Sequence, residues 1–500
     1  MTRATTLSRW TSTSRPFTIS AGDRALVASA LLAALSACSG DTDIIGRCIP
    51  TTDPAVLLSG SNGGDYVWWS PSVGLIDGHV WVTYVQNIDG KWLGLGRWYD
   101  ATTLAAESEP VRLGTVDIWE LQNWARDGDS LVGQVWADPA EPAEISSDDG
   151  LVHLWRVTPP PDATANGQRI ALTTYDPADN PFPLVPGRRR TITLSDLYAA
   201  GFQGALSVAV VGRAVVGALG AVAPCPGVAF GGVSVHSFGG DYAASRLPFP
   251  TVDCAIGGAG VPWLFPLDGD EVGLLYRHGE VDDHEVRYAR LDARGQPTSS
   301  SRIVGGGENT PCCDVTGGFQ PRGVRVRDHV LFTERRGDSS FCYTMRVMDL
   351  DGDDVDDAPW QLPCADDGGD GDGPVVTWIH QLVAVPGAAV LVWQERTNLF
   401  VGEAFTEDIT DPARYHEGVF AVMLTEDGKR GSAVMELTTP EFTAAEVDAA
   451  GTPVFALDTD VQVAADGNEV FATWIDRRAP TAPGPLAGYH ARSFRCVVDP

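Results

Sequence analysis

The sequence predicts an all-β protein with a repeated structural unit, and three observations lead to this prediction. Short runs rich in branched aliphatic and aromatic residues recur along the chain, and turn-forming residues separate them. The 500 residues include 55 glycines and 34 prolines, which is typical of a protein with many tight turns. Helical periodicity is nearly absent, since only 194–200 and 440–447 are short helix candidates.

The recurring runs end in an aromatic residue that a polar or acidic residue soon follows. Examples are 80–84 (VWVTY), 390–393 (VLVW) and 470–474 (VFATW). The spacing between copies is about 55 residues, with longer insertions in two places, which suits a four-stranded blade with long loops. The seven aligned positions are Tyr84, Trp136, Leu219, Tyr276, Phe332, Trp393 and Trp474.

A glutamine precedes the aromatic residue by 12 positions in three copies, at Gln320, Gln381 and Gln462. Gln122 and Gln203 are similar in two other copies. We expect the first three glutamines to occupy equivalent places on inner strands. They either line a central channel and bind a ligand or satisfy backbone groups between blades, which is the ordinary role of buried polar side chains.

Turn signals lie between the glutamine and the aromatic residue of several copies, at Asp127-Gly128, Pro386-Gly387 and Asp466-Gly467. Each unit should therefore open with an inner strand, turn tightly and run back. We predict a single β-propeller of six to eight blades, with seven favoured, over residues 60–500. The alternative is a pair of β-sandwich domains.

The N-terminal region carries an export signal. An arginine-containing polar leader precedes an apolar run at 25–35, which is too short for a membrane span of about 20 residues. The following Leu35-Ser36-Ala37-Cys38 resembles the lipobox of bacterial lipoproteins, which implies a signal peptide over 1–37, a lipid on Cys38 and a tether over 38–59. Ser39 favours the outer membrane of a Gram-negative bacterium by the same resemblance. The alternative is an ordinary signal peptide with a chance cysteine.

Cysteine usage agrees with export, because eight of the nine cysteines remain after Cys38 and an oxidising compartment would pair them. We predict that Cys48 and Cys496 form a disulfide that joins the first and last blades, although Cys48 could instead be a free thiol in the tether. The others should pair locally: Cys225 with Cys254, and Cys312 and Cys313 with Cys342 and Cys364 in some order.

The charge balance limits the partners. The chain has 66 Asp and Glu against 35 Lys and Arg, a net charge of -31. This charge repels phosphate backbones and anionic lipid, so we expect no nucleic acid partner and contact with the membrane through the lipid anchor only.

Alternating carboxylates at Asp349, Asp351 and Asp353 predict a calcium site, because this ion takes six to eight oxygen ligands. A similar run lies at 366–372. The segment departs from the EF-hand pattern, and the alternative is a solvated loop.

Acidic residues followed by arginine recur at strand ends, at Glu334-Arg335, Glu395-Arg396 and Asp476-Arg477. These ends resemble the blade repeats of bacterial sialidase-like propellers. In that family, arginines clamp a substrate carboxylate, but we expect these pairs to be structural ion pairs between blades. The family's Asp-box is only half met, by Ser146, Asp148 and Gly150.

The sequence contains no nucleophile elbow, HExxH motif, P-loop or dinucleotide-binding motif. We therefore expect an envelope-anchored propeller that binds a glycan, a peptide or a partner protein without catalysis. The alternative is an exported hydrolase or lyase that acts on a polysaccharide.

Overall fold

The chain folds into antiparallel sheets in which strands adjacent in sequence pair with each other. In this computed structural model, the described residues are 45–59, 72–88, 91–115, 123–137, 151–160, 168–173, 206–220, 232–238, 251–254, 259–280, 283–308, 321–335, 343–355, 359–362, 376–396, 417–438, 457–476 and 488–499. These residues contain strands and turns but no helix, so the all-β prediction is confirmed. Both helix candidates, the signal peptide, Cys38 and the residues before Ile45 lie outside the described residues.

The described strands form seven sheets. The first three are β3 (Ser72–Ile76), β4 (His79–Ile88), β5 (Lys91–Asp100) and β6 (Val111–Thr115); β7 (Trp124–Asp127), β8 (Ser130–Ala137), β9 (Leu151–Val157) and β10 (Gln168–Thr173); and β11 (Leu206–Val211), β12 (Ala214–Gly220), β13 (Gly232–Phe238) and β14 (Thr251–Cys254).

The next three sheets follow the same order along the chain. They are β15 (Ala259–Pro266), β16 (Glu271–Glu280), β17 (Asp283–Asp292) and β18 (Arg302–Glu308); β19 (Arg322–Val326), β20 (His329–Arg335) and β21 (Tyr343–Asp349); and β22 (Val376–Val385), β23 (Ala388–Arg396), β24 (Glu417–Leu424) and β25 (Met435–Glu436). The last sheet joins the two ends of the body, with β26 (Leu457–Asp466), β27 (Glu469–Asp476), β28 (Gly488–Val498), β1 (Gly46–Pro50) and β2 (Ala55–Ser59).

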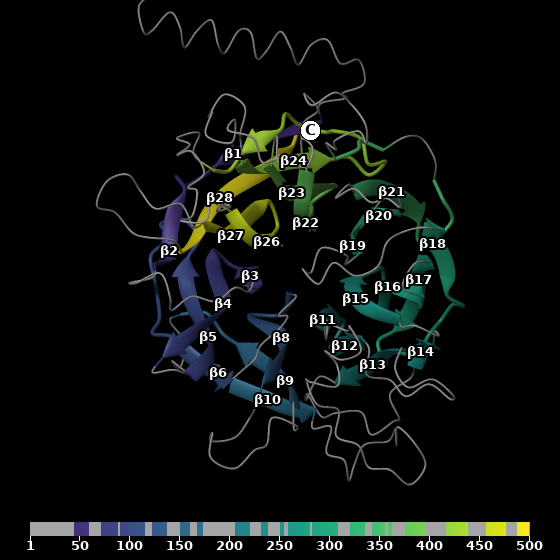
Figure 1. Ribbon diagram of the computed structural model, residues 1–500, viewed down its shortest axis with the longest axis horizontal. Helices are drawn as coiled ribbons and strands as arrows, with labels where there is room; N and C mark the ends of the chain where they lie inside the picture. The colour runs from purple at the N-terminus through teal and green to yellow at the C-terminus, as the bar shows by residue number, and fades with distance from the viewer. Residues whose placement is uncertain are drawn as a thin grey trace, which may run out of the picture. The chain divides into compact units, whose positions relative to one another are not determined.

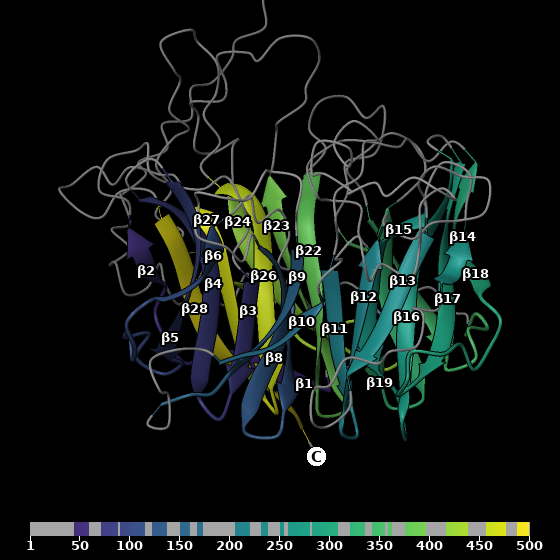
Figure 2. The ribbon, with the colours of Figure 1, turned by 90° about the horizontal axis from the view of Figure 1, so that it is seen from below.

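The first strand of each sheet lies innermost and contacts the first strand of the next sheet. The order of contact is β3, β7, β11, β15, β19, β22 and β26, and β26 contacts β3 again (Figure 1). The sheets stand side by side around this ring (Figure 2). The body is therefore a β-propeller.

The ring closes through strands from both ends of the body. β1 and β2 both pair with β28, which would otherwise present an unpaired edge. Residues 46–59 thus belong to the propeller, and the tether expected over 38–59 is wrong in its second part. Cys48 lies directly opposite Cys496 in this pairing, and the two form the predicted disulfide across 448 residues of sequence.

The hydrophobic core lies between neighbouring sheets, with at least one cluster of buried side chains at each of the seven junctions. At the junction of the first two sheets, the indole of Trp81 packs against those of Trp98 and Trp124, with ring centroids 5.2 and 5.8 Å apart. Gly96 is required here, because a Cβ at this position would overlap the Trp81 ring.

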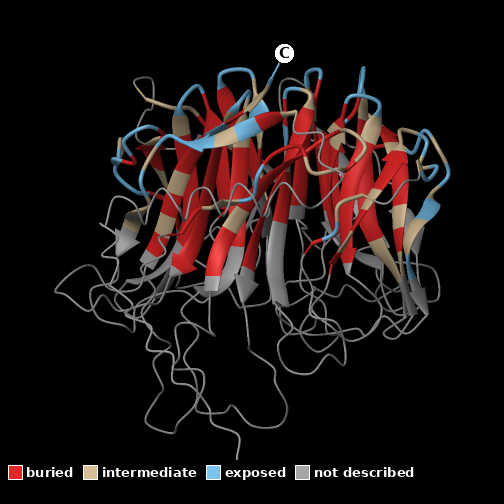
Figure 3. Ribbon diagram, turned by 90° about the horizontal axis from the view of Figure 1, so that it is seen from above, coloured by how far each residue is buried: buried red, intermediate tan, exposed pale blue. Residues whose placement is uncertain are grey.

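Short hairpin turns join the first and second strands of every sheet, and they lie on one face of the ring, called the turn face below. The turn at Asp77-Gly78 has positive φ at both residues (49° and 83°), which is the backbone of a type I′ hairpin. The predicted turns near Gly128, Gly387 and Gly467 are confirmed. Figure 3 shows exposed turns and the C-terminus on the same side of the ring.

Candidate functional site

One position in each innermost strand, or directly before it in the case of β7, lies five residues before the first residue of the hairpin turn. We call these seven positions the belt, because they lie at the same level around the channel. Six of them carry a polar or charged side chain, and all but one are buried. The belt residues are Ser72, Asn123, Ser207, Trp263, Arg322, Gln381 and Gln462.

Belt side chains bond the backbone of the next sheet, one residue beyond that sheet's own belt position. Asn123 Oδ1 accepts from Val208 N at 3.0 Å, and Asn123 Nδ2 donates to Val208 O at 2.7 Å. Ser207 Oγ accepts from Leu264 N at 2.9 Å. Trp263 and Gln381, described below, bond the next sheet in the same way. The same relation across four junctions shows that the belt holds neighbouring blades in register.

Gln381 continues this pattern and adds a contact between two side chains. Its Oε1 accepts from Val463 N at 2.9 Å, and its Nε2 donates to Gln462 Oε1 at 2.7 Å. Both glutamines are buried. The expectation that they occupy equivalent places and satisfy groups between blades is therefore confirmed.

The belt residue of β19 is not the one that the glutamine pattern indicates. Arg322 holds the belt position of β19, and Gln320 lies two residues upstream, outside the described residues. The aromatic alignment is shifted as well, because Glu334 and not Phe332 lies five residues after the start of the second strand, where Trp393 and Trp474 lie. A shift of two residues keeps every side chain on the same face of a strand, so the hydrophobic pattern alone does not reveal it.

Trp263 and Arg322 are the two large side chains of the belt. Trp263 Nε1 donates to Gly323 O at 2.6 Å, and the Arg322 guanidinium lies over the indole, 4.3 Å from its centroid. Both side chains are buried. This stacking pairs a buried cation with an aromatic ring, and arginine and tryptophan are among the side chains that most often anchor ligands and partners.

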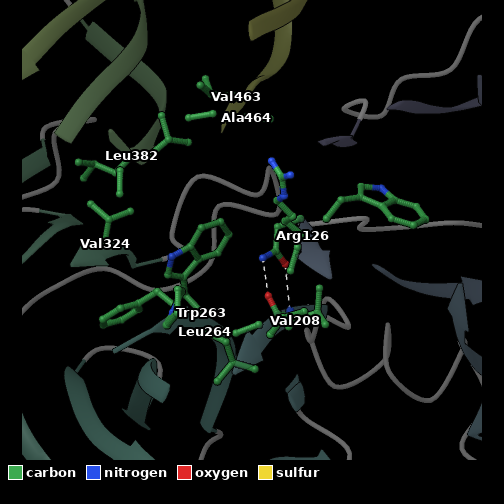
Figure 4. Close-up of a pocket in the computed structure, with 18 of the residues that line it drawn as sticks. Arg126, Val208, Trp263, Leu264, Val324, Leu382, Val463 and Ala464 are labelled. Atoms are coloured by element: carbon green, nitrogen blue, oxygen red, sulfur yellow. Dashed lines mark hydrogen bonds between the residues drawn. The ribbon is translucent and has the colours of Figure 1, made fainter. Parts of the chain in front are cut away.

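A cavity of about 310 Å³ lies between the belt and the turn face (Figure 4). All seven innermost strands contribute to its lining, which is mostly aliphatic: Val73, Leu75, Val208, Leu264, Val324, Leu382 and Val463. The polar or charged side chains among its described lining residues are Asn123, Arg126 and Arg325, and the indoles of Trp124 and Trp263 also contribute. An apolar cavity with a few fixed polar groups is the usual form of a small-molecule site.

Two of the lining residues, Arg126 and Arg325, form ion pairs at the turn-face end of the cavity. Arg126 contacts Asp77 at 3.0 Å and Asp466 at 2.7 Å, so it joins three sheets where the ring closes. Partial burial acts to lower the pKa of Arg126, but its bonds to Asp77 and Asp466 outweigh this and raise it. Arg325 pairs with Asp268 through both terminal nitrogens.

Glu334 is a buried carboxyl at the junction of the fourth and fifth sheets. It accepts from Arg346 Nε at 2.6 Å within its own sheet and from Gly306 N at 2.6 Å in the neighbouring sheet. Burial raises the pKa of Glu334, although attraction to Arg346 opposes the shift. Glu334 is thus structural, as expected, but its ion pair is with Arg346. The side chains of Arg335, Glu395, Arg396, Asp476 and Arg477 lie outside the described residues, as does the half Asp-box.

The predicted calcium ligands have other partners. Asp349 Oδ1 accepts from the backbone N of Asp351 and of Asp353, at 2.9 Å each, and so closes a tight turn. Asp351 pairs with Arg290 at 2.6 Å, and Asp353 pairs with Arg302. Among the described residues, no group of three or more His, Cys, Asp or Glu is arranged to hold a metal. Calcium binding stays a prediction.

The remaining predicted residues are not tested. Cys225, Cys312, Cys313, Cys342 and Cys364 lie outside the described residues, as does the side chain of Cys254. In the described part of the chain, no helix has the length and apolar character of a membrane span.

The sequence interpretation missed five of the seven belt residues: Ser72, Asn123, Ser207, Trp263 and Arg322. Counting back five residues from each hairpin turn would have found them, since Asp77, Gly128, Gly212, Asp268 and Arg327 all begin such turns. The recurring glutamine indicates only two of the seven belt residues, because the belt repeats a position along the innermost strands and not one residue type.

Comparison with known proteins gives similarity at the level of fold alone. The chain matches no family model and no curated protein. The β-propeller domain of the Trilobed protease from Pyrococcus furiosus is 7% identical over 86% of this chain and 93% of that chain, with a TM-score of 0.40. A neuraminidase-like protein from A/bat/Guatemala/164/2009 is 9% identical over 75% and 87%, with a TM-score of 0.36. A subtype N10 neuraminidase-like protein of A/little yellow-shouldered bat/Guatemala/060/2010 is 10% identical over 76% and 96%, also at 0.36.

Proposed function

We propose that this chain is an envelope-anchored propeller that binds a glycan, a peptide or a partner protein at its central channel and the face opposite the turn face. One observation carries the proposal: the belt joins neighbouring blades, and Trp263, which lines the central cavity, stacks on Arg322 of the next blade. A binding site held by such bonds loses little conformational freedom when a ligand arrives, which favours affinity.

The position of the hairpin turns supports the choice of face. Two long stretches of sequence between consecutive strands, 174–205 and 397–416, start and end at strand ends opposite the turn face. Binding residues are disproportionately found on such connections, which a rigid scaffold positions.

The anchor is part of the same proposal. We infer that Cys38 carries the lipid and that the mature chain lies at the outer membrane of a Gram-negative bacterium. Ile45 lies at the turn face, because the next residue, Gly46, pairs with Val498 at the turn-face end of β28, and Asp499 N donates to Ile45 O. Six residues lie between Cys38 and Ile45, so the Cα atoms of these two residues are at most about 25 Å apart. This short tether would leave the opposite face directed away from the lipid.

A binding screen tests the proposal. The mature chain with Cys38→Ser is applied to immobilised sialylated, uronic-acid and neutral oligosaccharides and to envelope peptides, beside Arg322→Gln and the exposed control Arg213→Gln. We expect one class to bind the parent chain and the control, and to bind Arg322→Gln at least tenfold more weakly. Circular dichroism checks that each variant folds. Binding to no class, or equal binding by all three chains, contradicts the proposal. Release of new reducing ends from an oligosaccharide would support the hydrolase or lyase instead.

A further inference from the structure

The N-terminal segment of the body, residues 45–59, lies along the whole length of β28. β1 pairs with the last part of β28, and β2 pairs with its first part. Between them, Thr51 N and Thr52 N donate to Ser493 O at 3.0 and 3.2 Å, and Ser493 N donates to Thr52 Oγ1 at 2.9 Å. The segment is thus a seam that runs from the turn face to the opposite face.

Side-chain burial contributes little to β1. Arg47, Ile49 and Pro50 are exposed, and Cys48 is only half-buried, whereas its partner Cys496 is fully buried. Backbone hydrogen bonds and the disulfide therefore provide most of the attachment. A five-residue edge strand of this kind opens easily from its end, because each backbone bond contributes only about 1 kcal/mol net.

The seam also supports the junction between the sixth sheet and the closing sheet. Arg492 of β28 donates from Nε to Thr52 O at 3.1 Å and from Nη1 to Glu436 O and Leu437 O at 3.2 and 3.0 Å. One guanidinium thus joins the N-terminal segment, β28 and the sixth sheet. Removal of the segment takes one of these partners away and uncovers the outer edge of β28.

We propose that the Cys48–Cys496 disulfide is a mechanical clamp that keeps the ring closed when force enters through the N-terminus. A pull on Ile45 can open only the residues before Cys48, where the covalent bond passes the force directly to β28. Without the bond, the same pull opens β1, then the Thr52 contacts, then β2. The proposal rests on the proposed anchor at Cys38, since that anchor makes the N-terminus the point where force enters a tethered protein.

Single-molecule force spectroscopy tests the clamp. The mature chain with Cys38→Ser carries one handle at its N-terminus and the other on an azide-bearing residue that replaces Arg213, an exposed residue of the β11–β12 turn. The oxidised chain is compared with the same chain bearing Cys48→Ser and Cys496→Ser, and with a sample treated with dithiothreitol.

In the oxidised chain, we expect no extension beyond that of residues 45–47 before the ring itself ruptures. In the double serine variant and the reduced sample, we expect an earlier event at lower force that releases residues 45–59, which is about 50 Å of extended chain. An early event of the same size in the oxidised chain overturns the clamp, as does the absence of this event from the double serine variant. The handle replaces the lipid, so neither result depends on whether Cys38 is acylated, which mass spectrometry decides separately.

Discussion

Gln381 Nε2 donates to Gln462 Oε1 at 2.7 Å across the junction of two neighbouring blades, although the two residues are 81 positions apart in sequence. The same amide accepts from Val463 N, so one side chain uses both its donor and its acceptor between blades. Both side chains are buried, where an unsatisfied polar group is costly. Gln381 therefore bonds both a side chain and the backbone of the neighbouring blade.

Gln381→Ala should lower the free energy of unfolding by about 1–3 kcal/mol, because it leaves Val463 N and Gln462 Oε1 buried without this partner. Urea denaturation at neutral pH measures the change. The control is Gln361→Ala, which removes an exposed amide that bonds Met345 within one sheet and should cost about 0.5 kcal/mol or less. Equal effects of the two substitutions would mean that the belt does not hold the blades together.

Glu334→Gln should remove a pH dependence of stability. The raised pKa of Glu334 means that the folded protein holds this proton more tightly than the unfolded chain does. Its contribution to stability is therefore fully present below the ordinary value of 4.5 and is lost as the pH rises through the folded pKa. The difference in unfolding free energy between parent and variant should thus fall with rising pH.

Urea denaturation at several pH values from 4 to 8 follows this difference. Asp328→Asn, at an exposed carboxyl of the β19–β20 turn, controls for the general effect of removing a negative charge. A difference that stays constant or grows with pH contradicts the assignment for Glu334.

Acylation at Cys38 should appear in the mass of the mature N-terminus, as a diacylated or triacylated cysteine. The expectation follows from the apolar run and the Leu-Ser-Ala-Cys sequence. Cys38→Ser should abolish the lipid mass and release the protein from the membrane fraction. A mature N-terminus cleaved at another residue, in a chain without lipid, would show that the segment is an ordinary signal peptide.

Calcium should bind at Asp349, Asp351 and Asp353 only if it displaces Arg290 and Arg302 from Asp351 and Asp353. Titration calorimetry of the chelator-treated protein at millimolar calcium measures this, with Asp351→Asn as the variant that should lose the signal. No heat, together with an unchanged melting temperature, means that these carboxylates serve the turn and the two ion pairs alone.

Local sequence signals determined the fold class, the hairpin turns and the closing disulfide. Alternation within a strand, Asp-Gly and Pro-Gly turns, and aromatic residues at strand ends are all properties of near neighbours in the chain. Cys48 and Cys496 could be paired because a ring must join its ends, so that its closure brings together the first and last strands.

Only the tertiary structure decided which residues form the belt and where the body begins. Gln320 and Arg322 differ by two residues, and both satisfy the same alternation, so the register had to come from the turn at Arg327 and from pairing with β20. Residues 46–59 have no strong strand pattern of their own, and they are strands because β28 offers an unpaired edge. Contacts such as Arg492 with Thr52 and Glu436 join positions hundreds of residues apart or in separate sheets. Their energy depends on geometry that exists only after the ring has closed.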